Sequence, residues 1–293
     1  MRTWVPAAFL AVIVLFLFPF VPGFLKKHLR QKPSMLFILP GLLVAAFCIV
    51  AWRVNALSWP LALLLCTYTV VPTALIFLQG MEAGPATWLD LAVILLLWLP
   101  IELNTGARWI PHHAQGLLHT VAYGVALILA LVLFLAFRGL KGMKYALPTR
   151  ARDFLDPLIA FIPLALVLIP LGRILSFLPP FHIPGNLSAT RIASSFAIIL
   201  AGTALPEEIL FRSLMQNWLA QKFAPTTATL VVASLIFGCA HLNNGPQPLP
   251  NWRYMILATI AGYAYGRVFQ RGSSAIASMV LHALVDLTKH VFF

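Results

Sequence analysis

The composition of this 293-residue chain excludes an ordinary water-soluble domain. Hydrophobic residues make up 61% of it and charged residues 10%, whereas soluble domains are roughly half apolar and about a quarter charged. The formal net charge is +12 at pH 7, but the Lys and Arg residues are scattered between apolar runs and form no continuous patch. We therefore expect a membrane protein in contact with the lipid bilayer and without a nucleic-acid partner.

Apolar runs in the first half of the chain approach the roughly 20 residues that a bilayer-spanning helix needs. The ten-residue alternation of a membrane β-barrel is not seen. The first run is followed by a basic cluster and has no small-residue cleavage motif, which favours a retained helix over a signal peptide. The expected helices lie at residues 5–24, 35–52, 57–78, 88–100 and 121–137.

The second half of the chain continues the same pattern after a basic loop. Together the runs predict an all-α, polytopic transmembrane bundle of roughly nine or ten helices. We divide it into residues 1–150, transmembrane helices of unknown role, and residues 151–293, a C-terminal core. In the core, helices are expected at residues 154–178, 189–222, 225–242, 252–270 and 273–293.

Small residues in the apolar runs predict close packing but no chemistry. Gly262 and Gly266 form a GxxxG motif, which lets two helices approach each other. Cys48, Cys66 and Cys239 lie inside apolar runs without CxxC spacing. Neither a disulfide framework nor a thiolate zinc site is therefore expected.

An adjacent acid pair stands out, because the chain has only eight Asp and Glu residues. Glu207 and Glu208 are flanked by apolar residues, where an ionisable group costs a few kcal/mol unless it is paired or hydrated. On a helix, Glu208 faces Arg212 four residues later, so we expect an ion pair. Glu207 points about 100° away and is the better candidate for exchanging a proton with a substrate. The alternative is that both glutamates lie solvated at the bilayer surface.

Two later apolar runs carry histidines. His241 ends one run, with Phe237 one turn before it, and His282 lies in another, with Asp286 one turn after it. A single histidine in an apolar helix more often makes a structural hydrogen bond than it catalyses a reaction. Carboxylates and imidazoles on three such helices nevertheless indicate a functional site.

These residues fall into three ordered motifs: EExxxR at 207–212, FxxxH at 237–241 and Hxxx(N/D) at 282–286. The set resembles the CPBP (CAAX protease and bacteriocin-processing) family of intramembrane proteases, which includes the type II CAAX prenyl endopeptidases. The resemblance covers about residues 189–289. It implies a membrane-embedded peptidase that acts on a peptide or membrane-protein substrate. For residues 151–293 it implies the protease core.

The resemblance also implies a role for each motif residue. Glu207 with His241 would activate a water molecule, and His282 would support the oxyanion. Glu208 and Arg212 would hold the site in shape. Asp286 stands where the family often has Asn, and since an ionised carboxylate cannot donate a hydrogen bond, it is expected to orient His282 instead.

Several alternatives stay open in the sequence. Glu207, His241 and His282 could form a His₂Glu site for Zn²⁺, although the resemblance favours a mechanism without a cofactor. The HExxH, GxSxG, YD and GxGD motifs of other intramembrane proteases are absent. A proton-coupled transporter and a non-catalytic scaffold or immunity protein are the rival functions. The expected location is a prokaryotic inner membrane, and whether a substrate is prenylated is not readable.

Overall fold

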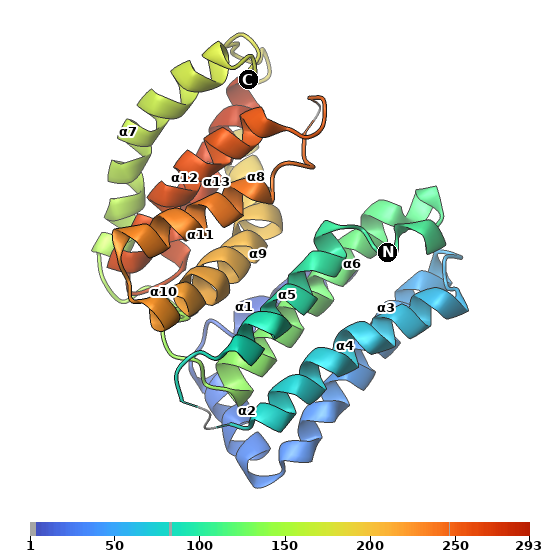
Figure 1. Ribbon diagram of the computed structural model, residues 1–293. Coiled ribbons are helices and arrows are strands. Elements are labelled where there is room, and N and C mark those ends of the chain that lie inside the picture. Colours follow the sequence, from blue (N-terminus) through green and yellow to red (C-terminus); the bar gives the residue numbers. More distant parts are fainter. Residues whose placement is uncertain (1–3, 82–83, 246) are drawn as a thin grey trace. The chain divides into compact units, whose positions relative to one another are not determined.

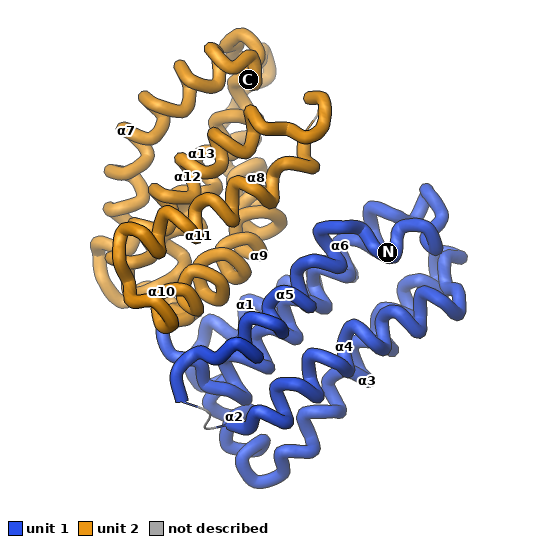
Figure 2. Tube along the Cα trace, in the orientation of Figure 1, with its two compact units in different colours: residues 1–142 blue, residues 143–293 orange. Residues whose placement is uncertain are grey.

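The computed structural model describes residues 4–81, 84–245 and 247–293, and every regular element in these ranges is helical (Figure 1). The all-α prediction is therefore confirmed. Backbone contacts divide the chain into two compact units, Met1–Gly142 and Met143–Phe293, coloured separately in Figure 2. Each unit is described by itself.

Unit 1 packs its helices around one buried helix. α6 is buried at intervals of three or four residues from Ala114 and then almost completely along its second half and along η3, which continues it. Its apolar side chains pack against α1, α3 and α5. The elements are α1 (Trp4–Leu15), α2 (Phe20–Gln31), η1 (Pro33–Phe37), α3 (Ile38–Arg53), α4 (Trp59–Gln79), α5 (Trp88–Glu102), η2 (Ala107–Trp109), α6 (His112–Ala130) and η3 (Leu131–Phe137).

The first apolar run is not the single helix that the sequence predicts for residues 5–24. It forms α1 and α2, which meet at a bend of 80°. Pro19 lies at the break, immediately before α2. Proline has no N–H to donate and disfavours the helical conformation of the residue before it, so one regular helix does not run through this point.

A buried ion pair joins the start of α5 to the end of η3 in unit 1. Arg138 Nη2 lies 2.8 Å from Asp90 Oδ2, and Arg138 Nε donates to Asp90 Oδ1 at 3.0 Å. Asp90 also forms the capping box of α5 with Thr87. The carboxylate is thus fully hydrogen-bonded away from water, the condition under which a charge tolerates burial.

Unit 2 contains a long helical stretch that runs through several elements, Ala189–Phe223, 35 residues in all. Within it, α-helical turns alternate with the wider turns of π-helix at η4 and η5. α11 and α12 pack along each other, and α13 contacts α7 and α8. The elements are α7 (Arg152–Ile174), α8 (Ala189–Ile199), η4 (Leu200–Ala204), α9 (Leu205–Glu208), η5 (Ile209–Gln216), α10 (Asn217–Phe223), α11 (Thr227–Cys239), α12 (Trp252–Arg271) and α13 (Ile276–Phe292).

A lysine closes the C-terminal end of α12. Lys144 Nζ donates to the carbonyl oxygens of Phe269, Gln270 and Gly272 at 2.8, 3.0 and 2.9 Å. These are among the carbonyls that a helix leaves without partners at its end, and a cation there also complements the helix dipole. The loop before α7 is thereby fixed to the turn between α12 and α13.

Glycines allow α11 and α12 to approach closely. A Cβ on Gly238 of α11 would collide with Thr259 Oγ1 and lie 2.7 Å from the carbonyl oxygen of Met255, both on α12. On α12, a Cβ on Gly262 would lie 2.8 Å from Phe237 Cδ1. The GxxxG motif, with Gly266, therefore serves helix packing inside unit 2.

We expect Gly238→Ala to destabilise unit 2, because the added methyl group meets a backbone oxygen that cannot move without shifting α12. Overpacking of this kind costs about 1–3 kcal/mol. Thermal unfolding in detergent should show a clearly lower Tm. Gly202→Ala is the matched control, since its Cβ would have nothing within 4 Å. Equal Tm values for the two variants would contradict the packing argument.

Five helices are long and apolar enough to cross a membrane, or up to six if α1 and α2 count as one bent span, among the described residues. The other helices are shorter or more polar, and α11, for example, has 13 residues. The prediction of nine or ten spanning helices is therefore not established by helix length and hydropathy. The five are Pro33–Arg53, Trp59–Gln79, His112–Phe137, Arg152–Ile174 and Ala189–Phe223.

Candidate active site

The acid pair lies in α9, a single α-helical turn between the two π-helical segments η4 and η5. Pro206 precedes the pair and has no N–H, so the regular hydrogen-bond ladder is interrupted at this point. The Glu208 side chain is completely buried, whereas that of Glu207 is 23% exposed. Two adjacent carboxylates thus occupy different environments.

Glu208 is held by a buried arginine. Arg212 Nε donates to Glu208 Oε2 at 3.2 Å, and both side chains have no exposed surface. The guanidinium also lies over the ring of Phe237, 4.8 Å from its centroid. The ion pair that the four-residue spacing predicts is present, and it is shielded from water.

His282 of α13 contacts the same glutamate. Its Nδ1 lies 3.1 Å from Glu208 Oε1. Since Glu208 is ion-paired with Arg212 and its carboxylate only accepts, Nδ1 carries a proton and donates it. The ring also stacks on Tyr265, with centroids 4.6 Å apart. The imidazole is therefore fixed in orientation from two sides, by a carboxylate 74 residues away in the chain and by an aromatic ring.

His241 lies just beyond the end of α11. Its Nδ1 donates to the carbonyl oxygen of Phe237 at 2.8 Å, one turn earlier. This bond sets the tautomer, because the proton on Nδ1 leaves the lone pair of a neutral ring on Nε2. Nε2 in turn faces Glu207 Oε2 at 3.9 Å.

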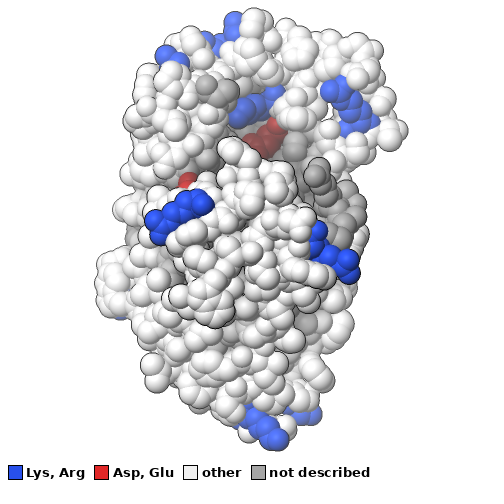
Figure 3. Space-filling view, turned by 90° about the vertical axis from the view of Figure 1, so that its right-hand side faces the viewer, with Lys and Arg blue, Asp and Glu red and all other residues white. Residues whose placement is uncertain are grey.

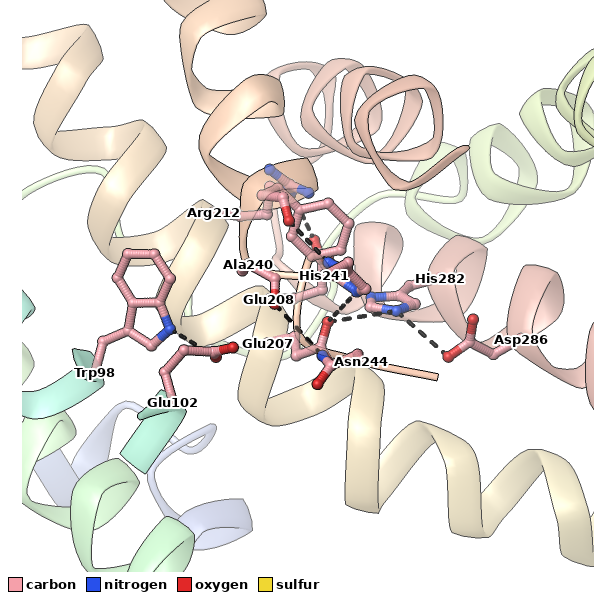
Figure 4. A network of polar contacts seen from close by, with 11 residues as sticks. Trp98, Glu102, Glu207, Glu208, Arg212, Ala240, His241, Asn244, His282 and Asp286 are labelled. Atoms are coloured by element: carbon pink, nitrogen blue, oxygen red, sulfur yellow. Dashed lines mark hydrogen bonds and ion pairs between the residues drawn. The ribbon is translucent and has the colours of Figure 1, made fainter. Parts of the chain in front are cut away.

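Both histidines face Glu207. Its Oε2 lies 3.9 Å from His241 Nε2 and 3.8 Å from His282 Nε2, and Figure 4 shows the three side chains turned toward one another. These distances exceed a direct hydrogen bond, which spans ~2.7–3.2 Å. An oxygen atom at hydrogen-bond distance from both a carboxylate and an imidazole fits this spacing. The geometry thus suits a water molecule or a substrate oxygen.

Asp286 lies one turn after His282 on α13. Its Oδ2 is 3.6 Å from His282 Nε2, which is an ion-pair distance and longer than a good hydrogen bond. The shorter hydrogen bond of His282 is the one that its Nδ1 donates to Glu208 Oε1. Sequence reasoning assigned the orientation of this histidine to Asp286 and missed the contribution of Glu208.

Aromatic side chains from α12 complete the walls, and sequence reasoning did not find them. Tyr254 meets His241 edge-on, with centroids 4.5 Å apart, and Tyr265 stacks on His282. The two tyrosines are 11 residues apart in the sequence, close to three helical turns, so they share one face of α12. This shared helix face is the feature of the sequence from which the two tyrosines could have been predicted to line one wall.

A cavity of ≈ 80 Å³ opens at this site. His241, His282 and Asp286 line it together with the α12 tyrosines, and the rest of its wall is mostly apolar. A largely apolar wall with a few convergent polar groups is typical of a ligand site. The low dielectric constant of such a cavity strengthens the interaction of its polar groups with charge that develops during a reaction.

Among the described residues, no group of three or more His, Cys, Asp or Glu side chains is arranged to hold a metal ion. Both ring nitrogens of His282 face carboxylates, Nδ1 toward Glu208 and Nε2 toward Glu207 and Asp286. The contact of Nδ1, at 3.1 Å, is within hydrogen-bond distance, whereas those of Nε2, at 3.8 and 3.6 Å, are longer.

Part of the chain matches a known protein family. Residues 189–288 match the sequence model of the Rce1-like type II CAAX prenyl endopeptidases. The matched segment contains all six residues of the three motifs, from Glu207 to Asp286. No curated protein and no solved structure matches the chain.

Proposed function

We propose, from the Rce1-like match over residues 189–288, that the chain is an intramembrane endopeptidase. It would hydrolyse a peptide bond of a peptide or membrane-protein substrate. One observation carries the proposal: Glu207 Oε2 lies within 4 Å of Nε2 of both His241 and His282. A carboxylate, an imidazole lone pair and a second, clamped imidazole are the groups that hydrolysis needs.

Glu207 and His241 would act on the attacking water. The water lies between Glu207 Oε2 and His241 Nε2 and gives a proton to the carboxylate as its oxygen bonds to the peptide carbonyl carbon. The carbonyl oxygen becomes negative in the tetrahedral intermediate. When the C–N bond breaks, the proton passes to the leaving amine. The products are a carboxylic acid and an amine, and Glu207 returns to its starting state.

His282 would support the oxyanion. Its ring is held by the hydrogen bond to Glu208 and by stacking on Tyr265, so it needs little reorganisation during the reaction. Nε2 is the nitrogen that faces Glu207 and the reacting atoms. Asp286 only accepts hydrogen bonds when ionised, so its proposed role is to balance the charge on His282.

We propose that the reaction needs no metal and that His282 is protonated at both ring nitrogens, Nδ1 toward Glu208 and Nε2 toward Glu207 and Asp286. Such a ring has no lone pair for a metal. We expect a strong zinc chelator to leave the cleavage rate within about twofold of the untreated enzyme. The rate is measured after removal of the chelator as well, to exclude an effect on the detergent or the substrate. Loss of activity that zinc alone restores would overturn the metal-free mechanism.

The direct test is cleavage of a quenched fluorescent peptide by the purified protein. The peptide ends in a cysteine, two aliphatic residues and a terminal residue, and it is supplied with and without a farnesyl group on the cysteine. The wild type is expected to cleave at least one form, and His241→Ala is expected to cleave neither above background. Equal rates for both proteins would show that the assigned site is not responsible.

The same assay distinguishes the peptidase from a proton-coupled transporter and from a non-catalytic scaffold, because neither of these hydrolyses a peptide. Apolar helices and the domain match support an integral membrane protein. The proposal extends this to a multi-pass bundle of nine or ten helices in a prokaryotic inner membrane, with the protease core in residues 151–293. Counting the spans by cysteine accessibility in intact cells tests that extension.

A further inference from the structure

Lys289 is a cation close to the site that the proposed mechanism does not use. It lies on α13 one turn after Asp286, and its Nζ is 4.4 Å from the ring centroid of Tyr254 and 4.7 Å from that of Phe177. Two aromatic faces therefore fix the ammonium group. These two ring contacts use no N–H group of Nζ for a hydrogen bond to oxygen, and Lys289 lines a cavity, so the ammonium group can donate to a ligand there.

Lys289 lies on the wall of a larger cavity, ≈ 860 Å³, that adjoins the one containing His241 and His282. The two cavities share Lys289, Asp286 and Tyr254. Figure 3 shows a hollow with basic and acidic atoms side by side on an otherwise sparsely charged face. A chain segment in the larger cavity could thus reach the reacting groups.

A second cation lines the same cavity. Arg173, near the end of α7, donates from Nη1 to the carbonyl oxygen of Leu178 at 2.8 Å, which fixes its position. The remaining guanidinium N–H groups are not used by that bond. Arg173 and Lys289 against Asp286 give the wall a net charge of +1, without counting His290, which also lines it.

The charge balance selects the class of ligand. A monoanion compensates a net charge of +1, whereas a dianionic phosphate would leave an excess negative charge beside Asp286. A planar carboxylate also matches the hydrogen-bond geometry of a guanidinium. The pocket is therefore suited to a carboxylate more than to a phosphate or a neutral group.

We propose that Arg173 and Lys289 form a carboxylate-binding subsite that positions the substrate for hydrolysis at Glu207. This inference rests on the proposed function and names a feature of its substrate. The carboxylate comes from the free C-terminus of the substrate or from an acidic side chain near the cleaved bond. Lys289 is a positioning residue, since it acts on a remote part of the substrate and not on the reacting atoms.

The test compares three quenched peptides of eight residues that differ only at the C-terminus. One ends in a free acid, one in an amide, and one in an amide preceded by glutamate. The wild type is expected to have a KM about tenfold lower for the acid than for the amide, the effect of one charge-assisted hydrogen bond. Lys289→Gln should abolish this preference, and Lys289→Arg should retain it. A low KM for the glutamate peptide would assign the carboxylate to a side chain.

Lys222→Gln is the matched control, because α10 lies at the opposite end of unit 2 from the C-terminus of α13 (Figure 1). It should keep the wild-type preference. If Lys289→Gln raises KM equally for the acid and the amide, Lys289 has a structural role only and the subsite is overturned. The same holds if the wild type does not discriminate among the three peptides.

Binding separates this inference from the proposed function. If the wild type cleaves none of the peptides, the peptidase proposal fails. Fluorescence anisotropy with the labelled acid and amide peptides then tests the subsite alone. Tighter binding of the acid by the wild type but not by Lys289→Gln supports it, and equal binding overturns it.

Discussion

Glu207→Gln is expected to lower kcat for peptide cleavage by about 10³-fold, within the range that a general base contributes. The amide has the shape of the carboxylate but cannot accept the proton of the attacking water. The 23% exposure of the side chain leaves room for a neutral replacement without a folding penalty. The measurement is the initial rate with the quenched CAAX-type peptide, together with a thermal unfolding curve in the same detergent.

Glu102→Gln is the matched control for this variant. Glu102 is also a partly buried glutamate on an apolar helix, and its Oε2 accepts a hydrogen bond from Trp98 Nε1 at 3.1 Å. Loss of the charge of Glu102 should leave kcat near the wild-type value. If Glu207→Gln keeps more than a tenth of the wild-type kcat with an unchanged Tm, Glu207 is not the base.

Arg212→Met is expected to destabilise the folded chain by about 3–5 kcal/mol, the usual result of removing one partner from a buried ion pair. Glu208 would keep its bond to His282 but lose the only arginine that contacts it among the described residues. The contact of the guanidinium with Phe237 would be lost as well. Thermal or denaturant unfolding in detergent measures the loss, and exposed Arg271→Met is the control.

A double-mutant cycle shows whether the loss comes from the stranded carboxylate. Glu208→Gln with Arg212→Met removes both charges, so the double variant should be more stable than the sum of the two single losses predicts. Strictly additive losses would mean that the two side chains act independently. Should Arg212→Met fail to fold at all, recovery of folded protein by the double variant gives the same answer.

The sequence was sufficient for the parts of the site that depend on local geometry. Composition excludes a soluble protein, and the four-residue spacing of Glu208 and Arg212 predicts their ion pair, because helical periodicity alone brings them together. Ionisable residues in apolar runs also identify Glu207, His241 and His282 as candidates. None of this requires knowledge of how the helices pack.

Contacts between helices were not predictable in the same way. The bond from His282 to Glu208 joins residues 74 apart, and the stacking of Tyr265 on His282 depends on the close approach of α12. Lys289 reads in the sequence as an ordinary basic residue in the last turn of a helix. Only the packing of Phe177 and Tyr254 around it shows that it faces a cavity.

The wide turns on either side of the acid pair bear on how related chains should be aligned. A π-helical turn contains one residue more than an α-helical turn, and such turns occur on both sides of Glu207, in η4 and η5. In a relative with a regular α-helix here, acidic residues that occupy the same place in space would be shifted by one sequence position relative to Glu207 and Glu208. Alignments that forbid a one-residue gap between residues 200 and 216 would then pair the wrong side chains and hide a shared site.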